Sequence, residues 1–159
     1  MKKVLFVCLG NICRSPLAEG LFLHKVQNQI LGDQIEVDSC GTGGWHVGHE
    51  PDARSLKVAA QYGIVLSSRA RKLRIEDFAT YDYIIAMDRS NLRDLRAQQQ
   101  YAEENKAQMF LMRDFDPLGK SKDVPDPYYG GEEGFQNVYE MLDRSTTEFL
   151  DFIQKNDLK

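Results

Sequence analysis

The sequence predicts an α/β protein in which helices cover both faces of a four-stranded parallel sheet. Two observations point to this class. Four short apolar runs, typical of buried strands, are separated by longer stretches with helical periodicity. The first run turns into a helix start within a few small and polar residues. Strands that alternate with helices pair in parallel, because right-handed crossovers return the chain to the same end of the sheet.

Each element is predicted from its own stretch of sequence. The expected strands are 4–8, 35–40, 83–87 and 108–112. The expected helices are 16–32, 51–62, a short one at 75–80, 90–106 and 134–155. Ser15 is the expected N-cap of the first helix, with Pro16 in its first turn, and Gly63 is a natural end for the second. Prolines break the periodicity of 114–129, which we expect to be a functional loop or excursion.

Length and composition suit one domain, which we expect to span residues 1–159. The net charge of −4 is mild and the sequence has no long basic run, so nucleic acid and anionic membrane are poor candidates for partners. Asn11 and Arg14 interrupt the first apolar run before it reaches the length of a signal peptide or a membrane span. We therefore expect a soluble, cytoplasmic protein.

The loop after the first strand is the strongest candidate for a functional site. A flavodoxin-like strand order, 2-1-3-4, reverses beside strand one, and ligands of such three-layer folds bind where the order reverses. Cys8 ends that strand, and Arg14 follows after five residues. Neither the dinucleotide fingerprint nor the Walker A pattern fits this loop, because it has one glycine and lacks Gly-Lys-Ser/Thr. The spacing predicts an anion cradle lined by backbone N–H groups of Leu9, Gly10, Asn11, Ile12, Cys13 and Ser15.

Metal or disulfide chemistry is not indicated. Cys8, Cys13 and Cys40 form an odd set without zinc-site spacing, so we expect no metal and no disulfide framework. The scattered histidines, His24, His46 and His49, are expected to be surface or loop residues.

Two motifs resemble those of the low molecular weight protein tyrosine phosphatases. They are Cys8-Leu9-Gly10-Asn11-Ile12-Cys13-Arg14-Ser15-Pro16 and Asp126-Pro127-Tyr128-Tyr129-Gly130. The similarity extends over nearly the whole chain, and the two motifs can meet only in the folded state. The resemblance implies a flavodoxin-like phosphatase that acts on tyrosine-phosphorylated proteins as a monomer or weak dimer, without metal or cofactor.

The resemblance also implies a role for each site residue. Cys8 is the expected nucleophile, Arg14 the bidentate phosphate ligand, and Asp126 the general acid and base. Ser15 is placed to donate its hydroxyl to the Cys8 sulfur. For Asp126, an ordinary turn aspartate before proline is the alternative.

Further positions are expected to shape and support the site. Trp45, Tyr128 and Tyr129 resemble the aromatic residues at the mouth of the family's pocket, although such rings also serve as packing residues. Ser39, with Asn11, corresponds to polar positions that hold the loop, while Ser68 stands where many relatives have histidine.

The family pattern leaves regulation and rival activities to be tested. Some relatives form a reversible disulfide at the positions of Cys8 and Cys13, which predicts a redox-sensitive enzyme. An arsenate reductase with the same loop is one rival, but it needs relay cysteines, and none follows Cys40. A non-catalytic phosphate or phosphotyrosine binding module is the other.

Overall fold

The computed structural model describes residues 1–158 and places the four predicted strands in one sheet. The strands are β1 (Lys2–Cys8), β2 (Ile35–Gly41), β3 (Tyr83–Ala86) and β4 (Gln108–Leu111). They lie in the order β2-β1-β3-β4, and every neighbouring pair is parallel. The predicted fold class and strand order are therefore confirmed.

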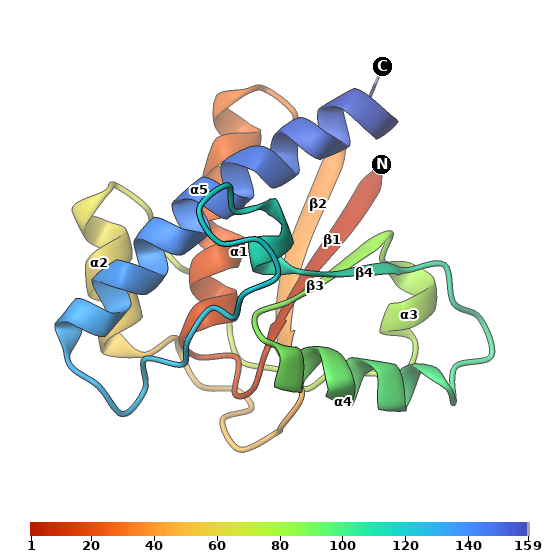
Figure 1. Ribbon diagram of the computed structural model, residues 1–159, viewed down its shortest axis with the longest axis horizontal. Coiled ribbons are helices and arrows are strands. Elements are labelled where there is room, and N and C mark those ends of the chain that lie inside the picture. The colour runs from red at the N-terminus through yellow and green to blue at the C-terminus, as the bar shows by residue number, and fades with distance from the viewer. Residues whose placement is uncertain (159) are drawn as a thin grey trace.

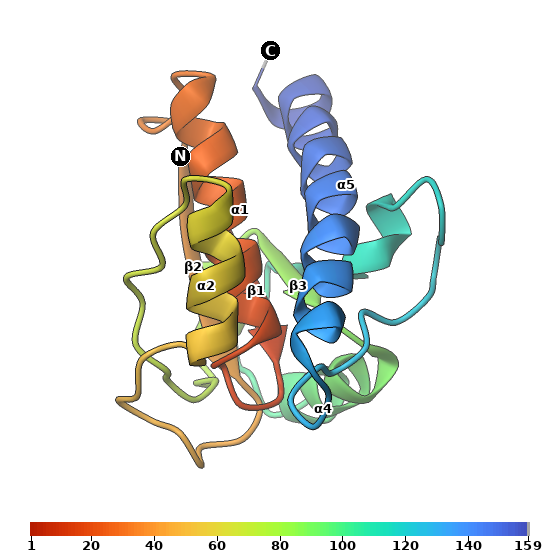
Figure 2. The same cartoon turned by 90° about the vertical axis from the view of Figure 1, so that its left-hand side faces the viewer.

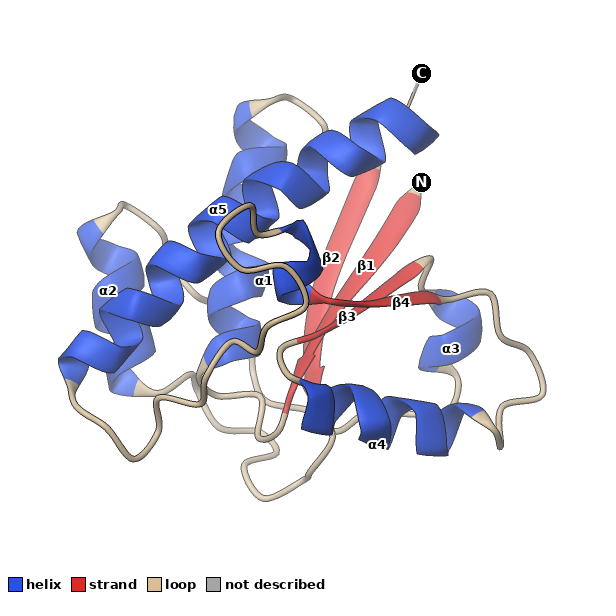
Figure 3. Ribbon diagram, viewed as in Figure 1, coloured by secondary structure: helices blue, strands red, loops and turns tan. Residues whose placement is uncertain are grey.

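Helices cover both faces of this sheet, as Figures 1 and 3 show. They are α1 (Arg14–Asn28), α2 (Ala53–Gln61), α3 (Asp77–Thr80), α4 (Arg89–Gln99) and α5 (Glu132–Asp157), with a 3-10 turn, η1, at Met112–Phe115. α1, α2 and α5 pack together on one face, whereas α3 and α4 lie on the other. Among residues 1–158, no helix has the length and apolarity needed to cross a membrane.

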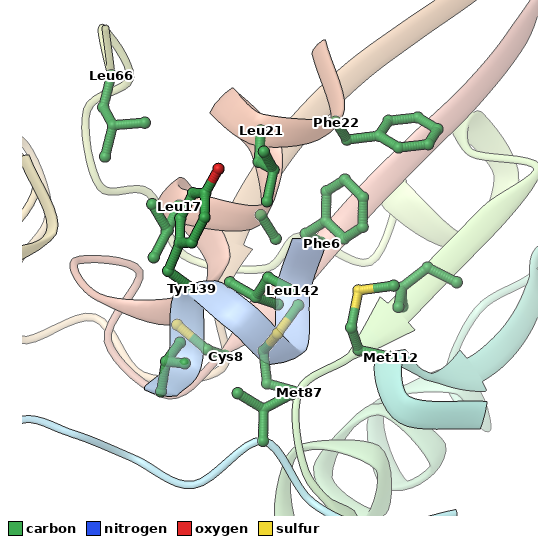
Figure 4. Close-up of a cluster of buried hydrophobic side chains, with 14 of the residues drawn as sticks. Phe6, Cys8, Leu17, Leu21, Phe22, Leu66, Met87, Met112, Tyr139 and Leu142 are labelled. Carbon is green, nitrogen blue, oxygen red and sulfur yellow. The ribbon is translucent and has the colours of Figure 1, made fainter. Parts of the chain in front are cut away.

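Alternate residues of β1 point into two separate cores. Val4 and Phe6 belong to the core under α1 and α5, and Leu5 and Val7 belong to the core under α3 and α4. Burial on both faces explains why this strand reads as a continuous apolar run. Cys8 continues the first series and lies at one end of the larger core (Figure 4), so the strand carries its sulfur directly to the site.

Three aromatic rings pack against one another in the larger core. Phe6 meets Phe22 of α1 and Phe149 of α5 edge-on, with ring centroids 5.5 and 6.2 Å apart. Phe22 and Phe149 stack with their centroids 5.2 Å apart. Because all three rings are fully buried, they fix both helices against β1 and thereby set the position of the loop between β1 and α1.

α1 differs from its prediction at both ends. It begins at Arg14 with Cys13 in the N-cap position, so the prediction of Ser15 as N-cap is wrong. The Ser15 side chain instead contacts the Cys8 sulfur inside the loop. α1 ends at Asn28 because Ile30 adopts a left-handed φ of 57° and leaves the helix, although its apolar side chain continues the periodic pattern.

α4 ends at Gln99, and the predicted continuation to residue 106 is wrong. The backbone N–H groups of Lys106 and Ala107 donate to the carbonyl of Phe78, at 3.0 and 3.2 Å. These bonds draw the chain across α3 into β4, and no buried residue follows Leu95 in α4 to hold a longer helix.

The loops that follow the strands gather at one edge of the sheet. Figure 2 shows the loop between β1 and α1 beside the loops before α2 and before α5, all at the lower edge of that view. The start of β1 and the end of α5 lie at the opposite edge (Figure 1). Segments distant in sequence can therefore combine at the edge where Cys8 ends β1.

The aromatic cluster predicts a large stability effect. Phe149→Ala should lower the free energy of unfolding by about 3–5 kcal/mol, because it leaves a cavity among fully buried rings. Urea unfolding measures this, with Tyr129→Ala as the control, since Tyr129 is 94% exposed and should change stability by less than about 0.5 kcal/mol. Equal effects of the two substitutions would contradict the assignment of the core.

Candidate active site

The loop between β1 and α1 has a backbone that its own side chains hold in place. Asn11 adopts a left-handed φ of 57°, a conformation that asparagine tolerates better than most residues. Its side-chain amide donates to the hydroxyls of Ser15 at 2.7 Å and Ser39 at 2.9 Å. Its side-chain oxygen accepts from the backbone N–H of Arg71 at 3.0 Å. Both donors and the oxygen of this buried amide thus hold the loop in its curved shape.

The Cys8 sulfur lies at the base of this loop, 2.9 Å from the Ser15 hydroxyl oxygen. Because the amide of Asn11 already donates to that oxygen, the hydroxyl hydrogen of Ser15 is left to point elsewhere. The Cys8 sulfur is the nearer acceptor, since the carbonyl of Cys40 lies 3.4 Å away. This arrangement presents a hydrogen-bond donor to a thiolate at Cys8.

Arg14 occupies the other end of the loop and is 2% exposed. Its Nη1 donates to the Asp88 carboxylate at 2.6 Å and to the carbonyl of Val124 at 2.9 Å. Burial opposes the charge of the guanidinium, but the groups around it, Cys8 and Asp88 foremost, outweigh burial and raise its pKa. With Nη1 fully used, Nε and Nη2 remain to bind an anion.

Asp126 reaches the loop from the long segment before α5. One carboxylate oxygen lies 3.7 Å from Nη2 of Arg14, and the other accepts from the backbone N–H of Tyr128 at 3.0 Å. Its side chain is 39% exposed, so the carboxylate faces the opening of the site. The fold therefore brings this predicted residue beside the loop.

These groups line a cavity of about 330 Å³. Its walls consist of Cys8, Leu9, Gly10, Ile12, Cys13, Arg14, Trp45, His46, Asp126, Tyr128 and Tyr129. The remaining predicted residues, Asn11, Ser15 and Ser39, are buried behind the loop, where they bond to one another. All the predicted site residues thus lie in the cavity wall or directly behind it.

Sequence reasoning missed four residues of this region. Asp88, the partner of Arg14, lies two residues after the end of β3 as the N-cap of α4, and its position just beyond a strand was an available signal. His46 lines the cavity and lies against Gly10, although nothing in its spacing set it apart. Glu19 and Arg54 act through tertiary contacts that no local pattern reveals.

Glu19 stands behind the loop as part of its support. Its carboxylate accepts from the Ser39 hydroxyl at 2.5 Å, and Ser39 in turn accepts from Asn11. Burial, with a smaller contribution from Asp38, raises the pKa of Glu19 to about 7. This carboxyl group therefore changes charge near neutral pH while it is linked to the loop through Ser39.

The three cysteines are free and buried. Burial, above all, raises the pKa of the Cys13 thiol well above its ordinary value, and it does the same for Cys40. A Cys8–Cys13 disulfide therefore stays a prediction. Among residues 1–158, no group of three His, Cys, Asp or Glu side chains is arranged to hold a metal ion.

An open parallel sheet with a Cys-x5-Arg anion loop at its switch point places a thiol beside an oxyanion site, an arrangement that suits a cysteine-dependent phosphatase. The comparisons with known proteins specify the class further. The family model described as low molecular weight phosphotyrosine protein phosphatase matches residues 3–159. The chain therefore belongs to this family.

Individual relatives agree over nearly their full length. The low molecular weight phosphotyrosine protein phosphatase of Schizosaccharomyces pombe is 46% identical over 149 residues, which cover 93% of this chain and 94% of the relative. A solved protein tyrosine phosphatase from Entamoeba histolytica is 39% identical with a TM-score of 0.89 and 98% coverage of each chain. DARP, a Drosophila arginine phosphatase, is 35% identical with a TM-score of 0.91, covering 99% of this chain and 100% of that one.

The position of Glu19 predicts a pH-dependent stability. Between pH 4.5, its ordinary pKa, and about 7, the folded protein retains a proton that the unfolded chain releases. The contribution of this group to the free energy of unfolding is therefore at its maximum below pH 4.5 and decreases as the pH rises to about 7. Glu19→Gln cannot ionise and should lack this decrease. Urea unfolding of both proteins across this range tests it, and a constant difference between them would contradict the assignment.

Proposed function

We propose that this chain is a protein tyrosine phosphatase that hydrolyses phosphotyrosine and other aryl phosphate monoesters through a phosphocysteine intermediate. One observation carries the proposal: the Cys8 sulfur, the free edge of the Arg14 guanidinium and the Asp126 carboxylate face one cavity. A nucleophile, an anion ligand and a proton donor are the three groups that such a displacement requires. Residues 1–159 would act as one catalytic domain, with tyrosine-phosphorylated proteins as substrates.

In the first step the Cys8 thiolate attacks phosphorus in line with the leaving oxygen. Nε and Nη2 of Arg14 bind two phosphoryl oxygens, because Nη1 is held by Asp88 and Val124. Backbone N–H groups of the curved loop bind the phosphoryl group as a fixed anion site. As the P–O bond breaks, its electron pair goes to the phenolic oxygen, which takes the proton of Asp126.

In the second step water displaces the Cys8 sulfur from phosphorus. Asp126, now ionised, removes a proton from the attacking water. The P–S bond breaks with its electron pair on sulfur, and the Ser15 hydroxyl donates to the departing thiolate across the 2.9 Å contact. Inorganic phosphate leaves, and the starting thiolate is restored.

The cavity walls support an aryl substrate. Trp45 is 70% exposed and Tyr129 is 94% exposed, so both rings stand free at the opening and can contact a phenyl ring. A short alkyl phosphate such as phosphoserine would leave these rings unused. Phosphoarginine, the class of substrate suggested by the name of the Drosophila relative, carries a cationic leaving group. Asp126 is the single acidic residue that lines the cavity among residues 1–158, and the proposed mechanism uses it as the proton donor. No further acidic side chain of the cavity wall is therefore left to pair with a cationic leaving group.

The rival activities find less support at this site. An arsenate reductase passes a disulfide outward through successive thiols. Cys40, the remaining cysteine outside the loop, is a residue of β2 that is fully buried in the core under α3 and α4, and it does not line the cavity. A pure binding module has no use for a thiol at the base of the cradle and a carboxylate at its opening.

Asp126→Ala should lower turnover of p-nitrophenyl phosphate by about 100-fold or more, because the leaving oxygen and the attacking water lose their proton donor and acceptor. Affinity for inorganic phosphate should be retained, since the loop and Arg14 are unchanged. Steady-state kinetics and phosphate inhibition constants measure both quantities. Wild-type turnover in this variant would remove Asp126 from the mechanism.

The same assay, extended to phosphotyrosine, phosphoserine, phosphoarginine and arsenate, separates the candidate functions. Cys8→Ser is the inactive control, and trapping of a phosphocysteine in a single turnover distinguishes an enzyme from a binding module. Turnover of phosphotyrosine well above the other compounds is expected. Preferential turnover of phosphoarginine, or thiol-dependent reduction of arsenate, would overturn the proposal.

Trp45→Ala tests the aromatic wall. Loss of its stacking surface should lower the preference for aryl over alkyl phosphates, measured as a ratio of kcat/KM values, by about 3- to 10-fold. Because Trp45 is exposed, the variant should fold normally, which a thermal melt can check. An unchanged ratio would exclude Trp45 as a substrate contact.

A further inference from the structure

Arg54, in the first turn of α2, binds the loop that carries Asp126. Its Nη1 donates to the carbonyl of Gly130 and its Nη2 donates to the carbonyl of Tyr128, both at 2.9 Å. The backbone of Tyr128 is therefore held on both sides of its α-carbon. Its N–H donates to the Asp126 carboxylate at 3.0 Å, while the carbonyl of the same residue accepts from Arg54.

The guanidinium is itself fixed in orientation. Asp52, the N-cap of α2, accepts from Nε and Nη2 of Arg54, both at 3.0 Å. The guanidinium carbon also lies 4.5 Å from the ring centroid of Phe135 and 5.7 Å from that of Tyr128. Two carboxylate contacts and two aromatic rings leave Arg54 little freedom to rotate.

The start of α2 also holds the phosphate loop. The backbone N–H of Asp52 donates to the carbonyl of Ile12 at 2.7 Å, and the Ser55 hydroxyl donates to the carbonyl of Cys13 at 3.2 Å. The first turn of α2 and its N-cap therefore bind the loop of Cys8 through Asp52 and Ser55, and they bind the loop of Asp126 through Arg54. Arg54 does not line the cavity and touches none of the groups that would react.

From this geometry we propose that Arg54 is a positioning residue, which fixes the Asp126 carboxylate relative to the phosphate loop so that it can deliver its proton to the leaving oxygen. The inference rests on the proposed phosphatase function and adds a residue to it. The proposed effect of Arg54 is confined to proton transfer, because Arg54 acts through the loop that carries Asp126. The Arg14 side chain and the loop of Cys8 are held by other contacts.

Arg54→Gln should therefore impair proton donation more than phosphate binding. In a series of aryl phosphates, kcat/KM should fall by about 10- to 100-fold for phenyl phosphate, whose leaving group needs a proton. The loss should shrink steadily toward 2,4-dinitrophenyl phosphate, whose phenolate leaves without one. The inhibition constant of inorganic phosphate should stay within about threefold of wild type, since the altered side chain lies outside the cavity.

A double-mutant cycle separates positioning from general damage. In an Asp126→Ala background, Arg54→Gln should cause no further loss on phenyl phosphate, because the group that it positions is gone. Arg54→Lys keeps the charge but cannot donate to both carbonyls and to Asp52 in one plane. Its kcat/KM for phenyl phosphate should therefore lie between those of the wild type and Arg54→Gln. This second variant also serves if Arg54→Gln does not fold.

Lys57→Gln is the matched control. Lys57 is also on α2 and pairs with Glu132 at the start of α5 at 2.8 Å, but both side chains are largely exposed and neither makes a hydrogen bond to the loop that carries Asp126. It should leave the whole substrate series unchanged.

Each outcome decides between the two proposals. A uniform loss for all leaving groups, or an additional loss in the Asp126→Ala background, would overturn the role of Arg54 while leaving the phosphatase function intact. No loss in either Arg54 variant would do the same. If the wild-type protein itself turns over no aryl phosphate, the proposed phosphatase function is wrong, and the role of Arg54 falls with it.

Discussion

The buried guanidinium of Arg14 is the group around which the site is organised. An isolated charge of this kind would destabilise the fold by several kcal/mol, so it must have partners. The protein supplies Asp88 from the end of β3 and the carbonyl of Val124 from the segment before α5, while Val124 also donates to the carbonyl of Met87. The contacts of this one cation thus fix three segments relative to one another: the loop after β1, the turn after β3 and the segment before α5. They leave the other edge of the guanidinium to face the cavity.

The elements that could be predicted are those whose cause is local. β1 could be predicted because a strand buried on both faces must be apolar throughout, and the parallel pairing of the strands could be predicted from their alternation with helices. The helix ends were not readable, because they depend on tertiary contacts. Ile30 keeps the apolar period yet turns left-handed, and α4 stops where Phe78 captures the backbone before β4. Ser15 fits the sequence pattern of an N-cap, but its hydroxyl contacts the Cys8 sulfur and does not cap α1.

In the candidate site, too, the residues with a local sequence signal could be predicted, and those that depend on tertiary contacts could not. Cys8 and Arg14 share one loop, so their spacing alone indicated an anion cradle. Asp126 needed the resemblance to a family, since its own surroundings read as a turn. Glu19 and Arg54 stayed hidden because each acts through a hydroxyl or carbonyl oxygen of a residue distant in sequence. Hydrogen bonds to such oxygens leave no pattern of residue types along the chain.

The position of the chain ends has a practical consequence for how this molecule can be attached to something else. The start of β1 and the end of α5 lie at the edge of the sheet opposite the loop between β1 and α1 (Figure 1), whose residues line the cavity. A fused partner, an affinity tag or a solid support joined at either end would extend away from the opening. An immobilised form of the protein would therefore present its cavity outward, which makes it suited to capturing bulky phosphorylated proteins as well as small esters.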